Sequence, residues 1–357
     1  MMDGQVDGKS NGGPLRTAIV GCGLAANELH LPALAALPGV EVTGVCDRDQ
    51  ERARHTAERF QIEGVFDDPE RMLSSLKLDN LHILTPPESH ADLACLGMEH
   101  GAHVLIEKPF AYTTQEADRV LAMAERTQRS VSVIHDELFY PAVDELRGRL
   151  ASGEVGEICW LHYISARRDQ TFVPDEWYYS THGGRFGETL PHALCLLVEM
   201  LEELEVRHVE ARSLGHTEIP ADFRVAAGFD ELRVLLSSQP NNALAEITYS
   251  FNSKLPTSLI VAGTEGSLIA RPFEGVQSLS TPASLKENVV AVARQGKERI
   301  AARIARGKRP SRIQDSGHYR QIEGWLKSIR GGTEPPVTAR SAREVVRLWQ
   351  AIVERYA

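Results

Sequence analysis

The stretch "AIVGCGLAANELH" (18–30) decides the fold class of this chain, because it joins an apolar strand to a helix through a glycine-rich turn. Gly21, Gly23 and Ala26 have the spacing of the G-x-G-x-x-G/A fingerprint. Gly21 permits a tight turn, Gly23 lets the backbone approach a pyrophosphate, and the small Ala26 permits close packing of helix on strand. Backbone amides at the start of the helix then face the phosphates. The stretch predicts a dinucleotide site, to which Leu24 and Ala25 also contribute.

Strand and helix patterns alternate through the first third of the chain. The helix expected at 114–128 has Thr113 or Thr114 as its N-cap and Glu116 in its first turn. Such alternation with short links is typical of a doubly wound parallel sheet, so residues 15–136 are predicted to form a Rossmann domain of the α/β class. Strands are expected at 15–20, 40–47, 64–66, 80–86, 103–109 and 130–135, and a second helix at 49–60.

From about residue 137 the pattern changes. Longer strand candidates follow one another with turn signals between them, which predicts a mostly antiparallel sheet. Residues 137–357 are expected to form a second α/β domain, whose C-terminal helices could pack back on the first. The strands are expected at 157–168, 206–215, 230–240, 242–251 and 258–270, and the helices at 141–153, 189–204, 319–330 and 341–356.

Composition narrows the class of protein. The length of 357 residues fits two domains, and the net charge of −10 argues against a nucleic-acid binder or a membrane-surface protein. No apolar run approaches the roughly 20 residues that span a bilayer. The polar residues 1–14 are expected to be a disordered lead-in rather than a secretory signal. The 5 scattered cysteines fit reduced cytoplasmic thiols, and no Cys/His spacing resembles a zinc site, so no metal is expected.

One segment is strongly basic. Between Arg294 and Arg312 stand eight basic residues and one acidic residue. The segment is interpreted as a solvated amphipathic helix and loop. Alternatively, its positive charge attracts an anionic substrate such as a phosphorylated or nucleotide sugar.

An acidic residue follows the second predicted strand. Asp47 lies about 20 residues after the fingerprint, where a carboxylate binds the adenosine ribose hydroxyls. Its charge would repel a 2′-phosphate, so NAD is favoured over NADP. The neighbouring Arg48 weakens this preference, because a guanidinium could pair with that phosphate or stack on adenine. Asp47 could also simply cap its turn.

Two motifs lie at the carboxyl ends of later strands, where open parallel sheets bind ligands. "TPPESH" (85–90) stiffens a loop against which a flat ring could lie, and "EKPF" (107–110) would direct Glu107 and Lys108 toward a nicotinamide. A lysine there can stabilise a developing alkoxide or transfer a proton. The alternative is an ordinary surface ion pair. The cofactor-site residues expected from both motifs are Thr85, Pro86, Pro87, His90, Glu107 and Lys108.

Several motifs in this order resemble the Gfo/Idh/MocA oxidoreductase family, typified by glucose–fructose oxidoreductase and inositol dehydrogenase. They are "AIVGCGLAANELHLPAL", "VCDRD", "TPPESH", "EKPF", "GGRFGETLPHALCL" and "GTEGSL". The resemblance covers nearly the whole chain from Leu15. It implies a Rossmann domain followed by an α/β domain with a large open sheet that commonly builds dimers or tetramers. It also implies NAD or NADP, a polyol or sugar-like substrate, Lys108 as the catalytic lysine, and a Lys108–Pro109 bond that is often cis.

The second domain is expected to supply the other half of the site. His192 lies four residues after Glu188, so both would face one side of a helix that starts near Glu188. An imidazole can take the hydroxyl proton near neutral pH, so His192 is predicted to be catalytic or to position the substrate. The resemblance implies an aspartate where Cys195 stands. It also implies an Asn-x-Arg pattern where residues 135–137 read His-Asp-Glu. The expected substrate contacts are His135, Tyr140, Arg167, Arg168, Trp177, Tyr178 and Glu188.

Together these features predict an NAD(P)-dependent oxidoreductase that transfers hydride between nicotinamide and a secondary alcohol carbon of a sugar, cyclic polyol or sugar derivative. A cytoplasmic homodimer or homotetramer is expected, assembled through the C-terminal sheet. Two alternatives stay open. One is a lyase or glycosidase that retains NAD and works through transient oxidation, and the other is a non-catalytic NAD-binding sensor.

Overall fold

The structure is a computed structural model that describes residues 13–167, 182–215, 229–272, 274–279, 314 and 316–356. The described chain divides into two compact units. The first contains the residues up to Ile134 together with Arg312–Arg343, and the second contains His135–Ser311 and Glu344–Ala357. The basic segment between Arg294 and Arg312 lies outside the described residues.

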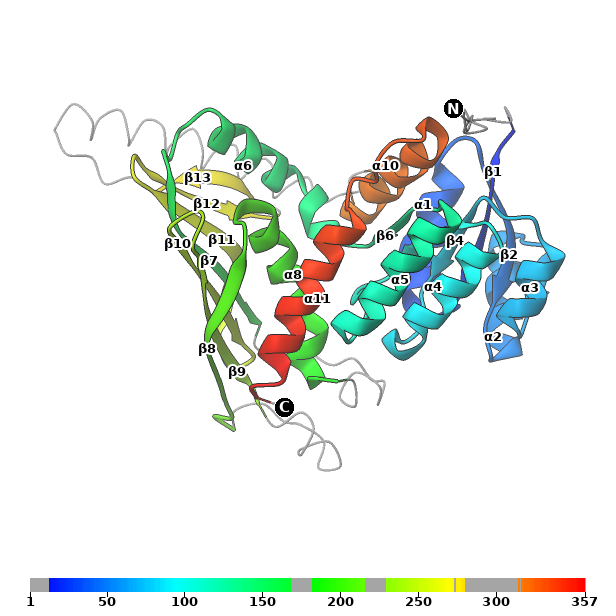
Figure 1. Cartoon of the computed structure of the whole chain (residues 1–357), viewed down its shortest axis with the longest axis horizontal. Helices are drawn as coiled ribbons and strands as arrows, with labels where there is room; N and C mark the ends of the chain where they lie inside the picture. Colours follow the sequence, from blue (N-terminus) through cyan, green and yellow to red (C-terminus); the bar gives the residue numbers. More distant parts are fainter. Residues whose placement is uncertain are drawn as a thin grey trace, which may run out of the picture. The chain divides into compact units, whose positions relative to one another are not determined.

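The first unit is built on a six-stranded sheet in the order β3-β2-β1-β4-β5-β6 (Figure 1). Every neighbouring pair is parallel, which confirms the predicted Rossmann sheet. The strand order reverses between β1 and β4, and ligands bind at such switch points, outside the carboxyl ends of the strands. The strands are β1 Leu15–Val20, β2 Val40–Cys46, β3 Gly64–Phe66, β4 Asn80–Ile83, β5 His103–Ile106 and β6 Val131–Val133.

Helices of the first unit follow from local signals. Thr113 caps α5 through a capping box with Glu116, as the sequence predicts. Two helices, α3 and α4, were not predicted from the sequence. The helical segments are η1 Ala26–His30, α1 Leu31–Ala36, α2 Gln50–Phe60, α3 Pro69–Ser75, η2 Pro87–Ser89, α4 His90–Glu99, α5 Thr114–Thr127 and α10 Gly317–Gly331.

The last of these helices, α10, comes from the far end of the chain. It lies beside α1 (Figure 1). Trp325 of α10 is fully buried, and its indole Nε1–H donates to Asn80 Oδ1 over 2.9 Å. Ile322 and Leu326 join the same apolar core as Ile19 of β1 and Leu34 of α1. The core of the first unit is therefore completed by residues distant in sequence.

The second unit is built on a seven-stranded sheet in the order β13-β12-β11-β7-β10-β9-β8. Among the described strands of this second sheet, only β7 and β10 pair in parallel, so the predicted mostly antiparallel sheet is confirmed. One predicted strand, 258–270, is wrong, because a turn divides it into β11 and β12. The strands are β7 Ile158–Arg167, β8 Leu204–Arg212, β9 Glu231–Ser238, β10 Ala243–Ser250, β11 Lys254–Gly263, β12 Ser267–Arg271 and β13 Gly275–Ser278.

Helices α6, α8 and α11 lie on one side of this sheet in Figure 1. The buried face of α8 packs toward β10, where the Tyr249 hydroxyl donates to Thr189 O over 2.6 Å. The prediction of a helix at 189–204 is wrong at both ends: α8 begins after Gly183, whose φ is +76°, and β8 follows directly. The helical segments are η3 Asp136–Phe139, α6 Pro141–Ala151, α8 Gly184–Met200 and α11 Ala339–Val353.

Within the part of the chain that the structure describes, no helix combines the length and the apolar character needed to cross a bilayer.

Candidate active site

The glycine-rich turn forms an open cradle after β1. Gly21 has a φ of +97°, and a Cβ added there would lie 2.6 Å from the backbone carbonyl carbon of Leu84. A Cβ added at Gly23 would meet nothing within 4 Å, so the backbone there faces open space. Ala26 is fully buried beneath the helix, while Leu24 is 80% exposed. This cradle fits a pyrophosphate group, which a side chain at Gly23 would obstruct.

Asp47 lies directly after β2, beside the cradle. One carboxylate oxygen accepts the Cys22 N–H over 2.9 Å and the other accepts the Asp49 N–H over 2.9 Å. The side chain is only 8% exposed, whereas Arg48 is exposed. Asp47 therefore fixes the glycine-rich turn to the end of β2. Since a carboxylate has about four acceptor positions, two backbone bonds leave capacity for ribose hydroxyls.

The loop after β4 is tied to the loop after β5 by His90. Its ring is fully buried, with Nδ1 2.8 Å from Pro109 O and Nε2 2.8 Å from Thr85 O. Burial lowers the pKa of His90, although both carbonyls oppose the shift. The structure thus places His90 beneath the loop surface, while Thr85 is half-buried, Pro86 is exposed and Pro87 is buried.

Glu107 and Lys108 end β5, and their side chains have different environments. The Lys108–Pro109 peptide bond is cis, and Lys108 is half-buried. The side chain of Glu107 turns inward, and its Oε2 accepts the backbone N–H of Lys108 over 3.1 Å. Glu107 is therefore not part of a surface ion pair. Its carboxylate does not project with Lys108 as the sequence reading expected, because two histidines bind it inside the unit.

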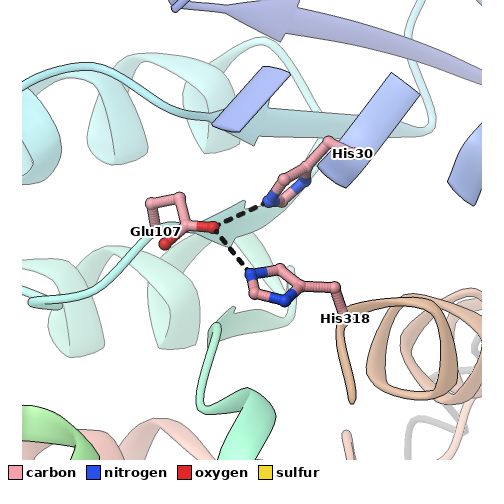
Figure 2. Close-up of side chains that lie close together, drawn as sticks. All are labelled: His30, Glu107 and His318. Carbon is pink, nitrogen blue, oxygen red and sulfur yellow. Dashed lines mark hydrogen bonds and ion pairs between the residues drawn. The ribbon is translucent and has the colours of Figure 1, made fainter. Parts of the chain in front are cut away.

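Two histidine side chains from distant segments converge on Glu107 Oε1 (Figure 2). His30, at the end of η1, places Nε2 2.9 Å from this oxygen, and His318 of α10 places Nε2 3.5 Å from it. His30 Nδ1 in turn lies 2.8 Å from His82 Nδ1 of β4. Both His30 and His82 are fully buried. The result is a continuous polar network through the first unit.

The pKa shifts in this network indicate which of its nitrogen and oxygen atoms carry protons. Burial alone would raise the pKa of Glu107, but the hydrogen bonds of His30 and His318 outweigh it and hold the value well below 4.5. Burial lowers the pKa of His30 and His82. A neutral His30 then donates Nε2–H to the ionised Glu107 and accepts at Nδ1 from His82. This leaves His82 Nε2 as a bare acceptor, which agrees with its having no hydrogen-bond partner among the described residues.

A second carboxylate–histidine contact lies in the second unit. His192 Nδ1 of α8 is 2.5 Å from Glu137 Oε1 of η3, and their side chains are 27% and 16% exposed. Beside them, the Tyr140 hydroxyl donates to Asp136 Oδ2 over 3.0 Å. His135 is buried. The structure therefore brings the predicted His192 next to a carboxylate from a different segment.

Glu188 lies one turn before His192 on α8 and is half-buried. The other predicted substrate contacts cannot be placed. Arg168, Trp177 and Tyr178 lie outside the described residues, as does the side chain of Arg167, whose backbone ends β7. Lys108 and His192 belong to different units.

Two sets of side chains offer ligand atoms within 4.8 Å of one another among the described residues. They are His30, Glu107 and His318, and Asp136, Glu137 and His192. These donor types suit a divalent cation such as zinc. In each set, however, a histidine nitrogen and a carboxylate oxygen lie within direct hydrogen-bonding distance. We therefore treat both sets as hydrogen-bonded pairs rather than as metal sites.

Sequence reasoning missed four of these residues: His30, His82, His318 and Glu137. A histidine in an otherwise apolar run, as in "NLHIL" (80–84), signals a buried polar group that needs a partner. The partner itself could not be read from the chain, because His30 and Glu107 are 77 positions apart.

Models of one family match most of the chain. Residues 15–135 match the oxidoreductase family with an NAD-binding Rossmann fold, and residues 143–269 match the GFO/IDH/MocA C-terminal domain. The chain belongs to the Gfo/Idh/MocA oxidoreductase family. The resemblance seen in the sequence is confirmed, and so are the predicted oxidoreductase class and the NAD-binding Rossmann domain.

Individual relatives within the Gfo/Idh/MocA family differ in how much of the chain they match. An uncharacterized oxidoreductase from Rhizobium meliloti is 25% identical over 95% of this chain and 96% of its own length. D-glucoside 3-dehydrogenase from Escherichia coli (strain K12) is 30% identical over 43% of each protein. Among solved structures, the WlbA dehydrogenase from Bordetella pertussis, in complex with NADH and UDP-GlcNAcA, has a TM-score of 0.77 at 19% identity and covers 96% of this chain and 95% of its own.

Proposed function

We propose that this protein is an NAD-dependent oxidoreductase that moves hydride between nicotinamide and a secondary alcohol carbon of a sugar or sugar derivative. The observation that carries the proposal is the position of Lys108. It is the second residue after β5, at the carboxyl edge of an NAD-binding Rossmann sheet, where ligands of this fold bind. A lysine at that edge supplies a cation for the oxygen of a reacting alcohol.

The roles of the side chains follow from their chemistry. When bound, the nicotinamide supplies the hydride chemistry. The Lys108 ammonium polarises the reacting oxygen, and His192 accepts the hydroxyl proton during oxidation and returns it during reduction. The backbone from Gly21 to Ala25 holds the pyrophosphate. Thr85, Pro86 and Pro87 form the loop against the nicotinamide, while His90 and Glu107 hold the two loops from beneath.

The preference for NAD over NADP rests on Asp47. Its carboxylate is fixed by two backbone amides beside the cradle, so it cannot swing away from a 2′-phosphate. A fixed negative charge there repels that phosphate and accepts the ribose hydroxyls. Arg48 is exposed and acts as a contact to the adenine.

The substrate class rests on the relatives. The name of the Escherichia coli relative places its reaction at position 3 of a glucoside, and the WlbA structure contains a nucleotide-linked sugar acid. A pyranose ring with a free secondary hydroxyl is therefore the proposed substrate. Tyr140 and Glu188 are proposed to contact it, together with His135, Arg167 and Trp177.

We also propose how copies of this chain assemble and where in the cell the protein works. The sheet of the second unit has its helices α6, α8 and α11 on one side. Leu244 on β10 is exposed, as expected for a sheet face that pairs with another copy. We propose a homodimer or homotetramer through this sheet. All five cysteines are free thiols in the structure, which supports a reducing, cytoplasmic setting.

A panel assay tests the function. The purified chain is incubated with NAD or NADP and with methyl glucoside, glucose, UDP-N-acetylglucosamine or myo-inositol, and the NADH absorbance band is followed. We expect reduction of NAD by at least one sugar, and its loss in Lys108→Met. Sugar consumption detected by mass spectrometry without NADH would favour transient oxidation by retained NAD. Tight NAD binding with every sugar unchanged would overturn the proposal in favour of a sensor.

A further inference from the structure

The pairing of His192 with Glu137 joins two segments of the second unit. Glu137 lies on the single turn η3, and His192 lies on α8, which packs against η3. The separation of 2.5 Å between Nδ1 and Oε1 makes this a close ion-pair contact, and two such polar atoms approach this closely only when a proton lies between them. Such a contact fixes both side chains toward one another rather than toward solvent.

This hydrogen bond determines the tautomer of His192. An ionised carboxylate can only accept, so the proton of the bond belongs to Nδ1. In the neutral ring the lone pair is then at Nε2, and that nitrogen is the one able to accept a proton. Without the carboxylate the ring could adopt the other tautomer, whose Nε2–H cannot act as a base.

The surroundings of Glu137 keep its carboxylate in place. The backbone of η3 is held by Arg147 of α6, whose Nη1–H donates to Leu138 O over 2.8 Å. Glu137 Oε2 is buried and has no hydrogen-bond partner among the described residues. Glu137 also lines a cavity of ≈ 20 Å³ together with Tyr140 and Tyr163. With one oxygen desolvated, the charge of Glu137 acts chiefly on the His192 ring.

Neighbouring groups respond to this buried charge. Burial raises the pKa of the Cys195 thiol, and the charges of Glu137 and Asp136 raise it further. Burial likewise raises the pKa of Tyr249 on β10, with contributions from Tyr163 and Glu137. Cys195 and Tyr249 therefore stay neutral. Among the described residues, the carboxylate in direct contact with His192 is that of Glu137, and Glu188 lies one turn before it on α8.

Resting on the proposed function, we propose that Glu137 is the positioning residue of His192. By accepting the Nδ1–H it orients the imidazole and presents Nε2 as the base for the alcohol proton. During oxidation of the alcohol, the O–H proton moves to Nε2 and the hydride leaves from the carbon to the nicotinamide. The resulting imidazolium keeps its Nδ1–H bond to Glu137, which stabilises the charge. Glu137 itself is not protonated in this scheme.

The first experiment measures the protonation of the His192 ring by NMR, independently of enzyme activity. The full chain is labelled with ¹⁵N-histidine, and the His192 ring signals are assigned by their loss in His192→Asn. We expect a protonated Nδ1 and an unprotonated Nε2 in the neutral ring of the wild type. In Glu137→Gln the titration midpoint of this ring falls by about one pH unit or more, because the imidazolium loses its counter-charge. A neutral ring with Nε2–H, or an unchanged midpoint, would overturn the proposal.

Kinetics supply the second arm, with a sugar that the panel identifies. Glu137→Gln is expected to lower kcat about 10²-fold with little change in KM and to move the acid limb of the pH profile to lower pH. Glu137→Asp, which keeps the charge, recovers part of kcat. Glu246→Gln is the matched control: it removes a carboxylate 3.9 Å from His162 in the same unit and leaves kcat unchanged. If Glu137→Gln is active with a normal pH profile, the positioning role of Glu137 is wrong and the proposed function stands. If the wild type is inactive on every sugar, the proposed function is wrong, and the NMR result alone tests whether Glu137 accepts the Nδ1–H of His192.

Discussion

Each unit of the molecule contains a carboxylate–histidine pair, and the two pairs differ in burial. In the first unit, Glu107 and His30 have side chains 12% and 0% exposed, and His318 and His82 extend the network. In the second unit, Glu137 and His192 are 16% and 27% exposed. In the buried network each proton is held in a hydrogen bond between two of its side chains. These bonds stabilise the end of β5. The more open pair leaves a ring that can exchange a proton with a ligand.

The comparison shows that one chemical pair serves two purposes according to its surroundings. A buried carboxylate bonded to neutral histidines stabilises a fold, because each donor and acceptor replaces water. A half-buried pair near the surface keeps the histidine available for acid–base chemistry. We therefore expect substitutions in the first pair to change stability and substitutions in the second to change rate.

The largest expected effect is on the rate. His192→Asn should lower kcat by about 10²–10⁴-fold, since it removes a general base, while the urea midpoint of unfolding stays close to that of the wild type. His100→Asn, at an exposed pair with Glu70, is the control. If His192→Asn turns over sugar at the wild-type rate, the assignment of the two pairs to different purposes is wrong.

Next comes the stability of the first unit. Glu107→Gln replaces the acceptor of the Lys108 N–H and of His30 by an amide that can satisfy only one of them well. The free energy of unfolding should fall by about 1.5–3 kcal/mol, the usual range for hydrogen bonds to charged groups. Urea denaturation followed by Trp fluorescence measures it. A loss below roughly 0.5 kcal/mol, the scatter of surface substitutions, would show that Glu107 does not stabilise the end of β5.

The buried histidines of the first unit, in this network and outside it, make stability depend on pH. Burial lowers the pKa of His30, His82 and His90 below 6.5, and burial also lowers the pKa of His103 to about 4. The unfolded chain therefore binds protons at these rings before the folded chain does. Stability is fully present above about pH 6.5 and falls below it, by at most about 1.4 kcal/mol per ring per pH unit.

Glu107 adds a second loss at lower pH. The pKa of Glu107 is held well below 4.5 in the folded state, so its contribution is complete above 4.5 and disappears as the pH falls toward the folded value. Urea midpoints should stay constant from about pH 7.5 to about pH 6.5 and decline from there to about pH 4. A flat profile above pH 5 would contradict neutral buried histidines.

The smallest effect is expected at a third pair, on the surface. His100 Nε2 lies 3.0 Å from Glu70 Oε1, with side chains 27% and 57% exposed. Glu70→Gln should change the free energy of unfolding by less than about 1 kcal/mol, because water screens exposed pairs. The urea midpoint in low and high salt measures this. An effect as large as that of Glu107→Gln would show that burial is not what separates the pairs.

Local signals predicted much of the first unit. The turn at Gly21 and the capping box of Thr113 with Glu116 depend on residues within a few positions, so the sequence contains all that is needed. The direction of Glu107 could not be predicted in this way. Its carboxylate turns inward because His30 and His318 meet there, and tertiary packing alone brings them together.

In the second unit, too, local features could be predicted from the sequence and long-range contacts could not. The helix with His192 could be predicted from the motif around it. Its partner could not, since Glu137 lies 55 positions earlier on a short turn that has no periodic pattern. The start of α8 was predicted too late: the helix begins at Gly184, after the N-cap Gly183, and glycine has a low helix propensity.

The placement of α10 has a consequence for biosynthesis. A ribosome adds about 5–20 residues per second from the N-terminus, so all six strands of the first sheet emerge before any strand of the second. Trp325 and His318, which close the first core and its polar network, are synthesised only after β13. The nascent nucleotide-binding unit therefore has an incomplete apolar core until α10 has been synthesised, and this interval is when a chaperone would act.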